Sequence, residues 1–188
     1  MTRGEWIGAL LCAAALAIAA NLSFPLPGTS LPQTAQTIVV LLSGALLGFN
    51  GASITILLYL LAGIVGLSVF ADGRSGAGVL FGPSGGYLLA FWFAAALIGY
   101  LADTGRLRRP RWRLLLWMLL AHALILLIGG GLLSVSVGIT AAWFNGVQPF
   151  WVGALVKSVI AAVIVLLLEL LPVAGGSKSS WQKQTTRQ

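Results

Sequence analysis

Residues 150–171 read FWVGALVKSVIAAVIVLLLELL, an apolar run that carries a single lysine, Lys157, near its start. A run of this length is sufficient to cross the hydrocarbon core of a bilayer as one helix. At a rise of ~1.5 Å per residue, Lys157 would stand roughly 10–12 Å below the start of that helix. Burying an ammonium group at membrane depth costs at least ~2.5–3.5 kcal/mol on insertion scales. Lys157 is therefore our first candidate for a functional residue, and the alternative is a side chain that snorkels to the nearer interface.

The whole chain shares the apolar character of this run. Of its 188 residues, 59% are hydrophobic and only 8% are charged, and the mean hydropathy is +0.98. Soluble domains carry about 25% charged residues, so the composition indicates an integral membrane protein in contact with lipid. The net charge of +7 does not point to nucleic acid, because the basic residues gather at the ends of apolar segments, as they do in membrane proteins.

Six apolar segments divide the chain, and we predict an all-α bundle of six transmembrane helices in one domain, residues 1–174. The segments are residues 7–20, 35–49, 52–70, 87–102, 114–133 and 150–171. The first two are short for a full span of ~20 residues. Residues 175–188 are polar, and we expect them to form a disordered cytoplasmic tail.

The distribution of basic residues predicts the orientation of the bundle. Six spans with both termini in the cytoplasm would place nine of the eleven Lys and Arg residues on the inner side: Arg3, Arg106, Arg108, Arg109, Arg111, Arg113, Lys178, Lys183 and Arg187. Only Arg74 and Lys157 would fall elsewhere. This arrangement satisfies the positive-inside rule, and it predicts a multi-pass protein of the inner (plasma) membrane of a prokaryote.

The same orientation leaves three long connections outside, and they carry most of the candidate site. Gln36 begins the second segment, and Gly86 and Tyr87 follow the glycine-rich stretch 71–86, where glycines allow a ligand to approach the backbone. Trp143 and Asn145 lie in the third outer connection. Together with Lys157, these six residues predict a pocket with apolar walls and a few polar groups, suited to a small amphipathic molecule.

The sequence lacks the residues that several kinds of chemistry require. The carboxylates are Glu5, Asp72, Asp103 and Glu169, and no two of them form an acid pair at the membrane midplane. One histidine, His122, and one cysteine, Cys12, offer neither a catalytic dyad nor a metal site. We interpret His122 as a hydrogen-bonded packing residue. No nucleotide-binding G-x-x-x-x-G-K-[ST] motif occurs. We expect a binding protein without a cofactor or bound metal, rather than an enzyme.

The first segment carries small residues at helical spacing, Ala9, Ala13 and Ala17. Such a face permits the close approach of another helix. We predict that it docks onto a partner protein in the membrane, with packing inside this bundle as an equally weighted alternative.

These stretches together resemble the BioY family, the biotin-binding S components of energy-coupling factor (ECF) transporters. The resemblance covers residues ~6 to 172. It rests on LPQTAQTIVVLLSGALLG (31–48), LLYLLAGIVGLSVFA (57–71), FGPSGGYLLAF (81–91), His122 near a triple glycine, GVQPF (146–150) and Lys157.

The resemblance implies a six-helix subunit that captures biotin from the outside, with Gln36, Tyr87 and Lys157 at positions that are polar around the ligand in the family. It further implies a transmembrane coupling subunit and cytosolic ATPases as partners, and it gives the small-residue face of the first helix the role of docking onto the coupling subunit.

One position departs from the family pattern. BioY proteins usually read G-D-x-x-K before the last helix, whereas this chain has Ala154 in place of the aspartate. In the family, that acid looks suited to the ureido N–H groups of biotin. Two alternatives therefore remain open: an S component for another vitamin or a biotin precursor, and a membrane scaffold protein that transports nothing.

Overall fold

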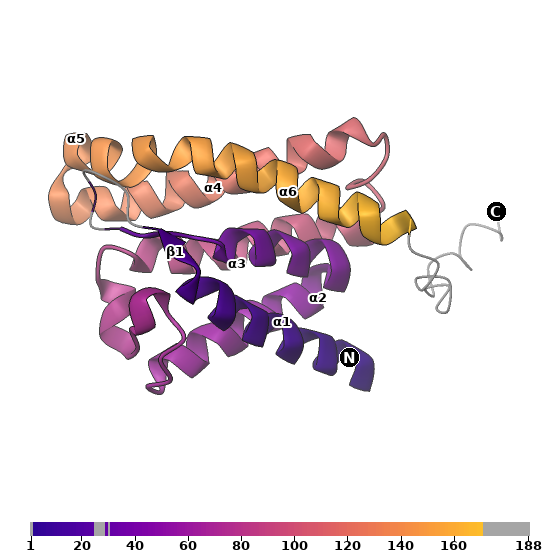
Figure 1. Cartoon of the computed structure of the whole chain (residues 1–188), viewed down its shortest axis with the longest axis horizontal. Helices are drawn as coiled ribbons and strands as arrows, with labels where there is room; N and C mark the ends of the chain where they lie inside the picture. The colour runs from indigo at the N-terminus through magenta and orange to yellow at the C-terminus, as the bar shows by residue number, and fades with distance from the viewer. Residues whose placement is uncertain (1, 25–28, 30, 171–188) are drawn as a thin grey trace.

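The chain folds into an elongated helical bundle (Figure 1). The computed structural model describes residues 2–24, 29 and 31–170. Its long helices are α1 (Arg3–Asn21), α2 (Gln36–Ile64), α3 (Gly85–Asp103), α4 (Trp112–Val137) and α6 (Trp151–Leu170). The shorter elements are β1 (Ser23–Phe24), β2 (Gln33–Thr34), η1 (Ala71–Gly73), η2 (Ala77–Phe81), α5 (Ile139–Ala142), η3 (Trp143–Val147) and η4 (Gln148–Phe150). The predicted tail, 175–188, lies outside the described residues.

Within the described residues, five helical stretches are long and apolar enough to cross a membrane: Arg3–Asn21, Gln36–Ile64, Gly85–Asp103, Trp112–Val137 and Ile139–Leu170. The chain is thus a multi-pass membrane protein. The sequence predicted six spans, and the difference arises because α2 contains most of both predicted segments, 35–49 and 52–70, as one element that ends at Ile64.

Helix α2 is bent back on itself at Gly48. The φ and ψ angles of Gly48 are 68° and −173°, outside the helical region. Gln36 donates a hydrogen bond from Nε2 to the hydroxyl of Tyr59, although 23 residues separate them in the sequence. In a straight helix these residues would stand roughly 35 Å apart. The two halves of α2 therefore run side by side in opposite directions, and the predicted connection at 50–51 lies instead at Gly48.

The reversal at Gly48 requires a glycine for two reasons. A positive φ is unfavourable for residues with a Cβ, and a Cβ built on Gly48 would lie 2.2 Å from Oδ1 of Asp103. The carboxylate of Asp103, at the end of α3, accepts a hydrogen bond of 2.9 Å from the backbone N–H of Phe49. Asp103 thus satisfies a backbone donor that the break in the helix leaves free.

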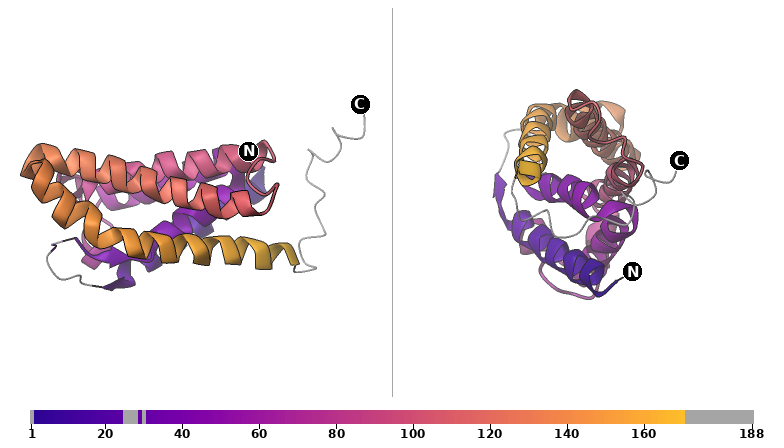
Figure 2. Two further views of the ribbon diagram at one scale, coloured as in Figure 1. Left: turned by 90° about the horizontal axis from the view of Figure 1, so that it is seen from above. Right: turned by 90° about the vertical axis from the view of Figure 1, so that its right-hand side faces the viewer.

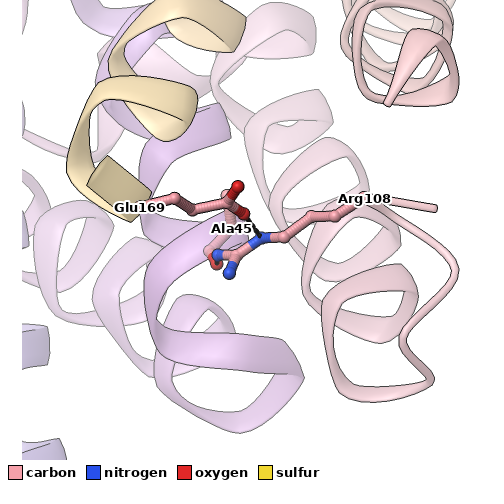
Figure 3. A network of polar contacts seen from close by, with 3 residues as sticks. All are labelled: Ala45, Arg108 and Glu169. Carbon is pink, nitrogen blue, oxygen red and sulfur yellow. Dashed lines mark hydrogen bonds and ion pairs between the residues drawn. The ribbon is translucent and has the colours of Figure 1, made fainter. Parts of the chain in front are cut away.

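The α2 reversal, the start of α1, the end of α6 and the arginine-rich loop 104–111 lie at one end of the bundle, which we call the basic end (right in Figure 1). There Arg108 joins three segments (Figure 3). Its Nη2 donates to the carbonyl of Ala45 at 2.8 Å, and its Nε lies 3.2 Å from Oε1 of Glu169. Glu169 therefore pairs with a basic residue of the same chain.

The opposite end, which we call the loop end, contains β1, β2 and the short helical turns (left in Figure 1). Strands β1 and β2 form an antiparallel ribbon that the all-α prediction did not include. Ser23 donates to Asp72 at 3.2 Å, which ties the first outer connection to the second. The third connection, expected to be a loop, is largely helical, because α4 extends to Val137 and α5, η3 and η4 follow.

The core lies between the helices, which surround the long axis in the end-on view (Figure 2, right). Leu41, Ile56, Ile98 and Met118 are fully buried there. The small-residue face of α1 is turned toward this core: Ala9 has no exposed surface, and Ala13 and Ala17 pack against the core in part. The small-residue face therefore packs inside the bundle, and its docking onto a second protein stays a prediction.

Candidate functional site

A pocket opens at the loop end, where α2, α3, α4, α6 and the first two outer connections meet. It holds about 720 Å³ of space when its open mouth is included. Apolar side chains form most of the wall. The lining residues are Leu31, Pro32, Thr34, Gln36, Thr37, Phe70, Ala71, Arg74, Ser84, Tyr87, Leu88, Phe91, His122, Ile125, Leu126, Phe150, Ala154 and Lys157.

Two cations line this pocket, and no carboxylate does so among the described residues. Lys157, largely buried on α6, donates from Nζ to the carbonyl oxygen of Thr34 at 3.1 Å. Arg74, between η1 and η2, donates from Nε to the carbonyl oxygen of Ala71 at 3.1 Å. Neither cation has an ion-pair partner among the described residues. Each cation retains N–H groups beyond these bonds, so the pocket carries positive charge with unused donors.

Three further polar atoms in the lining are buried and have no hydrogen-bond partner in the described part of the chain: Oγ1 of Thr37, Oγ of Ser84 and Nε2 of His122. An unsatisfied buried polar atom costs about 1–3 kcal/mol. Their gathering in one pocket means that a ligand with its own donors and acceptors would recover part of that cost.

Gln36 acts as part of the pocket wall. Its Oε1 accepts a hydrogen bond from the hydroxyl of Thr34 at 3.0 Å, and its Nε2 donates to Tyr59. The hydroxyl of Tyr59 donates in turn to the carbonyl of Val69 at 3.1 Å. This chain of bonds joins β2, both halves of α2 and the second outer connection, and so it fixes the shape of the pocket.

Tyr87 closes another side of the pocket and joins α3 to η3. Its hydroxyl donates to the carbonyl oxygen of Gly146 at 2.7 Å. Its ring lies against α4 so closely that a Cβ on Gly129 would come within 2.2 Å of it. The ring of Phe150 stands 6.4 Å away, tilted by 42°, so the two rings offer an aromatic surface to a ligand.

The structure brings together three of the six predicted site residues, Lys157, Tyr87 and Gln36. Gly86 is buried against Leu132 and Gly129 instead of lining the pocket. Trp143, 54% exposed, and Asn145 lie in η3 and are also absent from the lining. Gly86 ends the glycine-rich stretch and Trp143 and Asn145 lie in the third connection, as expected. That connection is helical, however, and both Trp143 and Asn145 are exposed there.

Sequence reasoning missed Arg74 and underestimated His122. A signal for Arg74 was present, because Arg74 and Lys157 are the two basic residues that fall outside the basic clusters. His122 does make the predicted packing hydrogen bond, with Ser158 at 2.8 Å, but its side chain also lines the pocket, and its other nitrogen has no partner among the described residues. Thr37 and Ser84 gave no signal that separates them from the other hydroxyl residues. The described residues contain no cluster of His, Cys, Asp and Glu that could hold a metal ion.

The sequence model of the BioY family matches residues 1–172. The chain belongs to the BioY family. Among its relatives, the biotin transporter BioY of Thermotoga maritima is 35% identical over 174 residues, covering 90% of this chain and 98% of that protein. The biotin transporter BioY2 of Lactococcus lactis subsp. cremoris is 33% identical over 160 residues, covering 84% and 86% of the two chains.

The BioY fold assignment also holds in three dimensions. A crystal structure at 2.1 Å of the S-component for biotin from an ECF-type ABC transporter superposes with a TM-score of 0.79 at 25% identity. The match covers 91% of this chain and 95% of that chain. These relatives are transporters and transporter components by name, which points away from an enzyme.

Proposed function

We propose that this BioY protein is the biotin-binding, substrate-specificity subunit of an ECF-type vitamin uptake transporter, and that the pocket at the loop end captures the vitamin. The observation that carries the proposal is the pair of cations, Lys157 and Arg74, in an otherwise apolar pocket whose described lining holds no carboxylate. Relatives named as biotin transporters and an S-component for biotin support the choice of ligand.

Biotin has three parts, and the pocket offers a complement to each. The carboxylate can pair with Arg74 or Lys157. The apolar ring and alkyl chain can lie against Phe70, Phe91 and Phe150. The polar cyclic urea can use the unpartnered atoms of the lining.

We further propose six spans with both termini in the cytoplasm of a prokaryote, counting the halves of α2 as two spans. The reversal at Gly48 supports this count. The gathering of the arginine-rich loop 104–111 with the ends of α1 and α6 supports a cytoplasmic basic end. The pocket then faces the outside of the inner membrane.

The energy for uptake would come from partner subunits. The sequence carries no P-loop motif, so we propose a transmembrane coupling subunit and cytosolic ATPases as partners. Movement of the whole bundle against the coupling subunit would release biotin inside. Docking through the α1 face would use Ala13 and Ala17, which are only partly buried, more than the fully buried Ala9.

Equilibrium binding of radiolabelled biotin to the purified protein in detergent tests the proposal. We expect one saturable site with a dissociation constant below the micromolar range, competed by unlabelled biotin. Absence of binding below micromolar concentrations would contradict the proposed function.

A different small carboxylic acid, another vitamin or a biotin precursor, is the second candidate. The observation that favours it is Ala154, which lines the pocket and contributes no polar side-chain atom. A thermal-shift panel of vitamins and precursors separates the two, because the physiological ligand should raise the melting temperature most at equal concentration. If no ligand stabilises the protein and no partner copurifies with it, neither transport candidate is favoured.

A further inference from the structure

His122 on α4 is a buried side chain that lines the pocket and has one ring nitrogen without a partner among the described residues. The residue is 3% exposed. Its Nδ1 lies 2.8 Å from Oγ of Ser158 on α6, and its Nε2 has no partner among the described residues. One ring nitrogen therefore bonds to the protein, and the other is available to a ligand.

The bonds of Ser158 determine which nitrogen carries the proton. The hydroxyl of Ser158 also lies 2.8 Å from the carbonyl oxygen of Ala154, with the geometry of a donor. A hydroxyl has one hydrogen. If Ser158 donates to Ala154, it must accept from His122, so Nδ1 bears the hydrogen and Nε2 bears the lone pair.

The opposite tautomer is less favourable for two reasons. It would remove the Ser158–Ala154 hydrogen bond, and it would point an N–H group into a pocket that already holds Lys157 and Arg74. A lone pair directed toward these cations is electrostatically favourable, whereas a second donor is not. The neutral ring therefore presents an acceptor to the pocket.

The remaining side chains of the described lining supply few acceptors. Carboxylates are absent, Oε1 of Gln36 already accepts from Thr34, and the hydroxyls of Thr37 and Ser84 can donate as readily as accept. The imidazole nitrogen is a stronger base than a hydroxyl oxygen. A ligand N–H group in this pocket has Nε2 of His122 as its best side-chain partner.

Resting on the proposed function, we propose that Nε2 of His122 accepts a hydrogen bond from a ureido N–H of biotin and so selects cyclic ureas over other apolar carboxylic acids. The urea then lies against α4 and the Ala154 face of α6. His122 determines specificity here, while the cations bind the anionic end.

Nitrogen NMR tests the tautomer directly, because His122 is the only histidine in the chain. The protein is labelled with ¹⁵N-histidine and purified through a tag that contains no histidine. We expect one protonated and one unprotonated ring nitrogen in the free protein, and an upfield shift of the unprotonated signal when biotin binds. Protonation of both nitrogens in the free protein, or a signal that biotin does not move, would overturn the inference.

Binding to His122→Phe tests the selectivity. The ligands are biotin and two analogues, each methylated on one ureido nitrogen. The variant should weaken biotin binding by about tenfold or more, as expected when a buried donor loses its partner. For one methylated analogue, which lacks the N–H in question, the same change should cause no further loss. A second variant, His122→Phe with Ala154→Asp, should recover much of the biotin affinity. His122 and the backbone carbonyl of Ala154 both bond to Ser158, so position 154 lies beside the histidine in the lining and an aspartate there would supply an acceptor.

Thr37→Val is the matched control, since it removes another unpartnered polar atom from the lining and should affect biotin and the analogues alike. Equal losses for biotin and both analogues in His122→Phe would assign His122 a structural role and overturn the inference. If the wild-type protein binds biotin and His122→Phe binds it with the same affinity, the inference is overturned and the proposed function is not. Wild-type protein that binds no biotin would overturn the proposed function as well.

Discussion

Lys157 illustrates how a single residue can mark a site in an apolar sequence. Its side chain lines the pocket, and its one hydrogen bond in the described chain is to the carbonyl oxygen of Thr34. A neutral carbonyl offsets only part of the cost of burying a charge. An anionic ligand would offset the rest of that cost, which would account for the buried position of Lys157.

Replacing Lys157 by alanine should weaken biotin binding far more than replacing Arg113, an exposed arginine at the basic end. A hydrogen bond to a charged group contributes about 1.5–3 kcal/mol, or roughly ten- to hundredfold in Kd. Titration calorimetry of both variants measures the difference. Equal affinities in the two variants would relegate Lys157 to a structural role.

Arg74 should pair with the negatively charged carboxylate of the ligand. Arg74→Gln removes the cation supplied by the outer connection, and we expect it to weaken biotin by roughly tenfold. Binding of biotinamide, in which the carboxylate is neutral, should change little. A competition assay compares the two ligands, and an equal loss for both would mean that Arg74 does not pair with the carboxylate.

At the scale of elements, apolar length and charge spacing predicted the helices well, because both follow directly from the bilayer. They could not locate the reversal in α2. Residues 50 and 51 look like a turn by composition, but the contact between Asp103 and Phe49 selects Gly48.

Gly48→Ala should destabilise the protein more than Gly105→Ala. Both glycines have a positive φ, 68° and 69°, so both substitutions strain the backbone, and the ψ of −173° at Gly48 lies in a region almost restricted to glycine, where the cost is about 1–3 kcal/mol. Only at Gly48 would the new methyl group meet a neighbour, the Asp103 carboxylate, because nothing lies within 4 Å of a Cβ at Gly105. Thermal unfolding in detergent measures both, and equal losses would contradict the proposed role of Asp103.

Arg108→Ala should lower the free energy of unfolding by about 1–2 kcal/mol, since it removes a hydrogen bond to Ala45 and a partly exposed ion pair with Glu169. Arg109→Ala removes the same charge from an exposed position in the same loop and serves as the control. Unfolding at low and high salt separates the two bonds, because screening weakens chiefly the ion pair. No difference between the variants would show that the junction in Figure 3 does not hold the basic end together.

For the whole molecule, the sequence predicted a helical membrane bundle and its family, and it identified Lys157, Tyr87 and Gln36 as lining residues. The full pocket could not be predicted, because its lining comes from four long helices and parts of all three outer connections, whose packing no local pattern encodes. His122 is the clearest example: the sequence suggested a packing residue, and only the fold shows that it lines the pocket with one ring nitrogen unpartnered among the described residues.

The structure of the protein bound to biotin tests the central claim most directly. We predict one biotin molecule in the loop-end pocket, with its carboxylate paired with Arg74 or Lys157 and its cyclic urea against His122. Biotin bound outside this pocket, or bound inside it with its carboxylate away from both cations, would contradict the account.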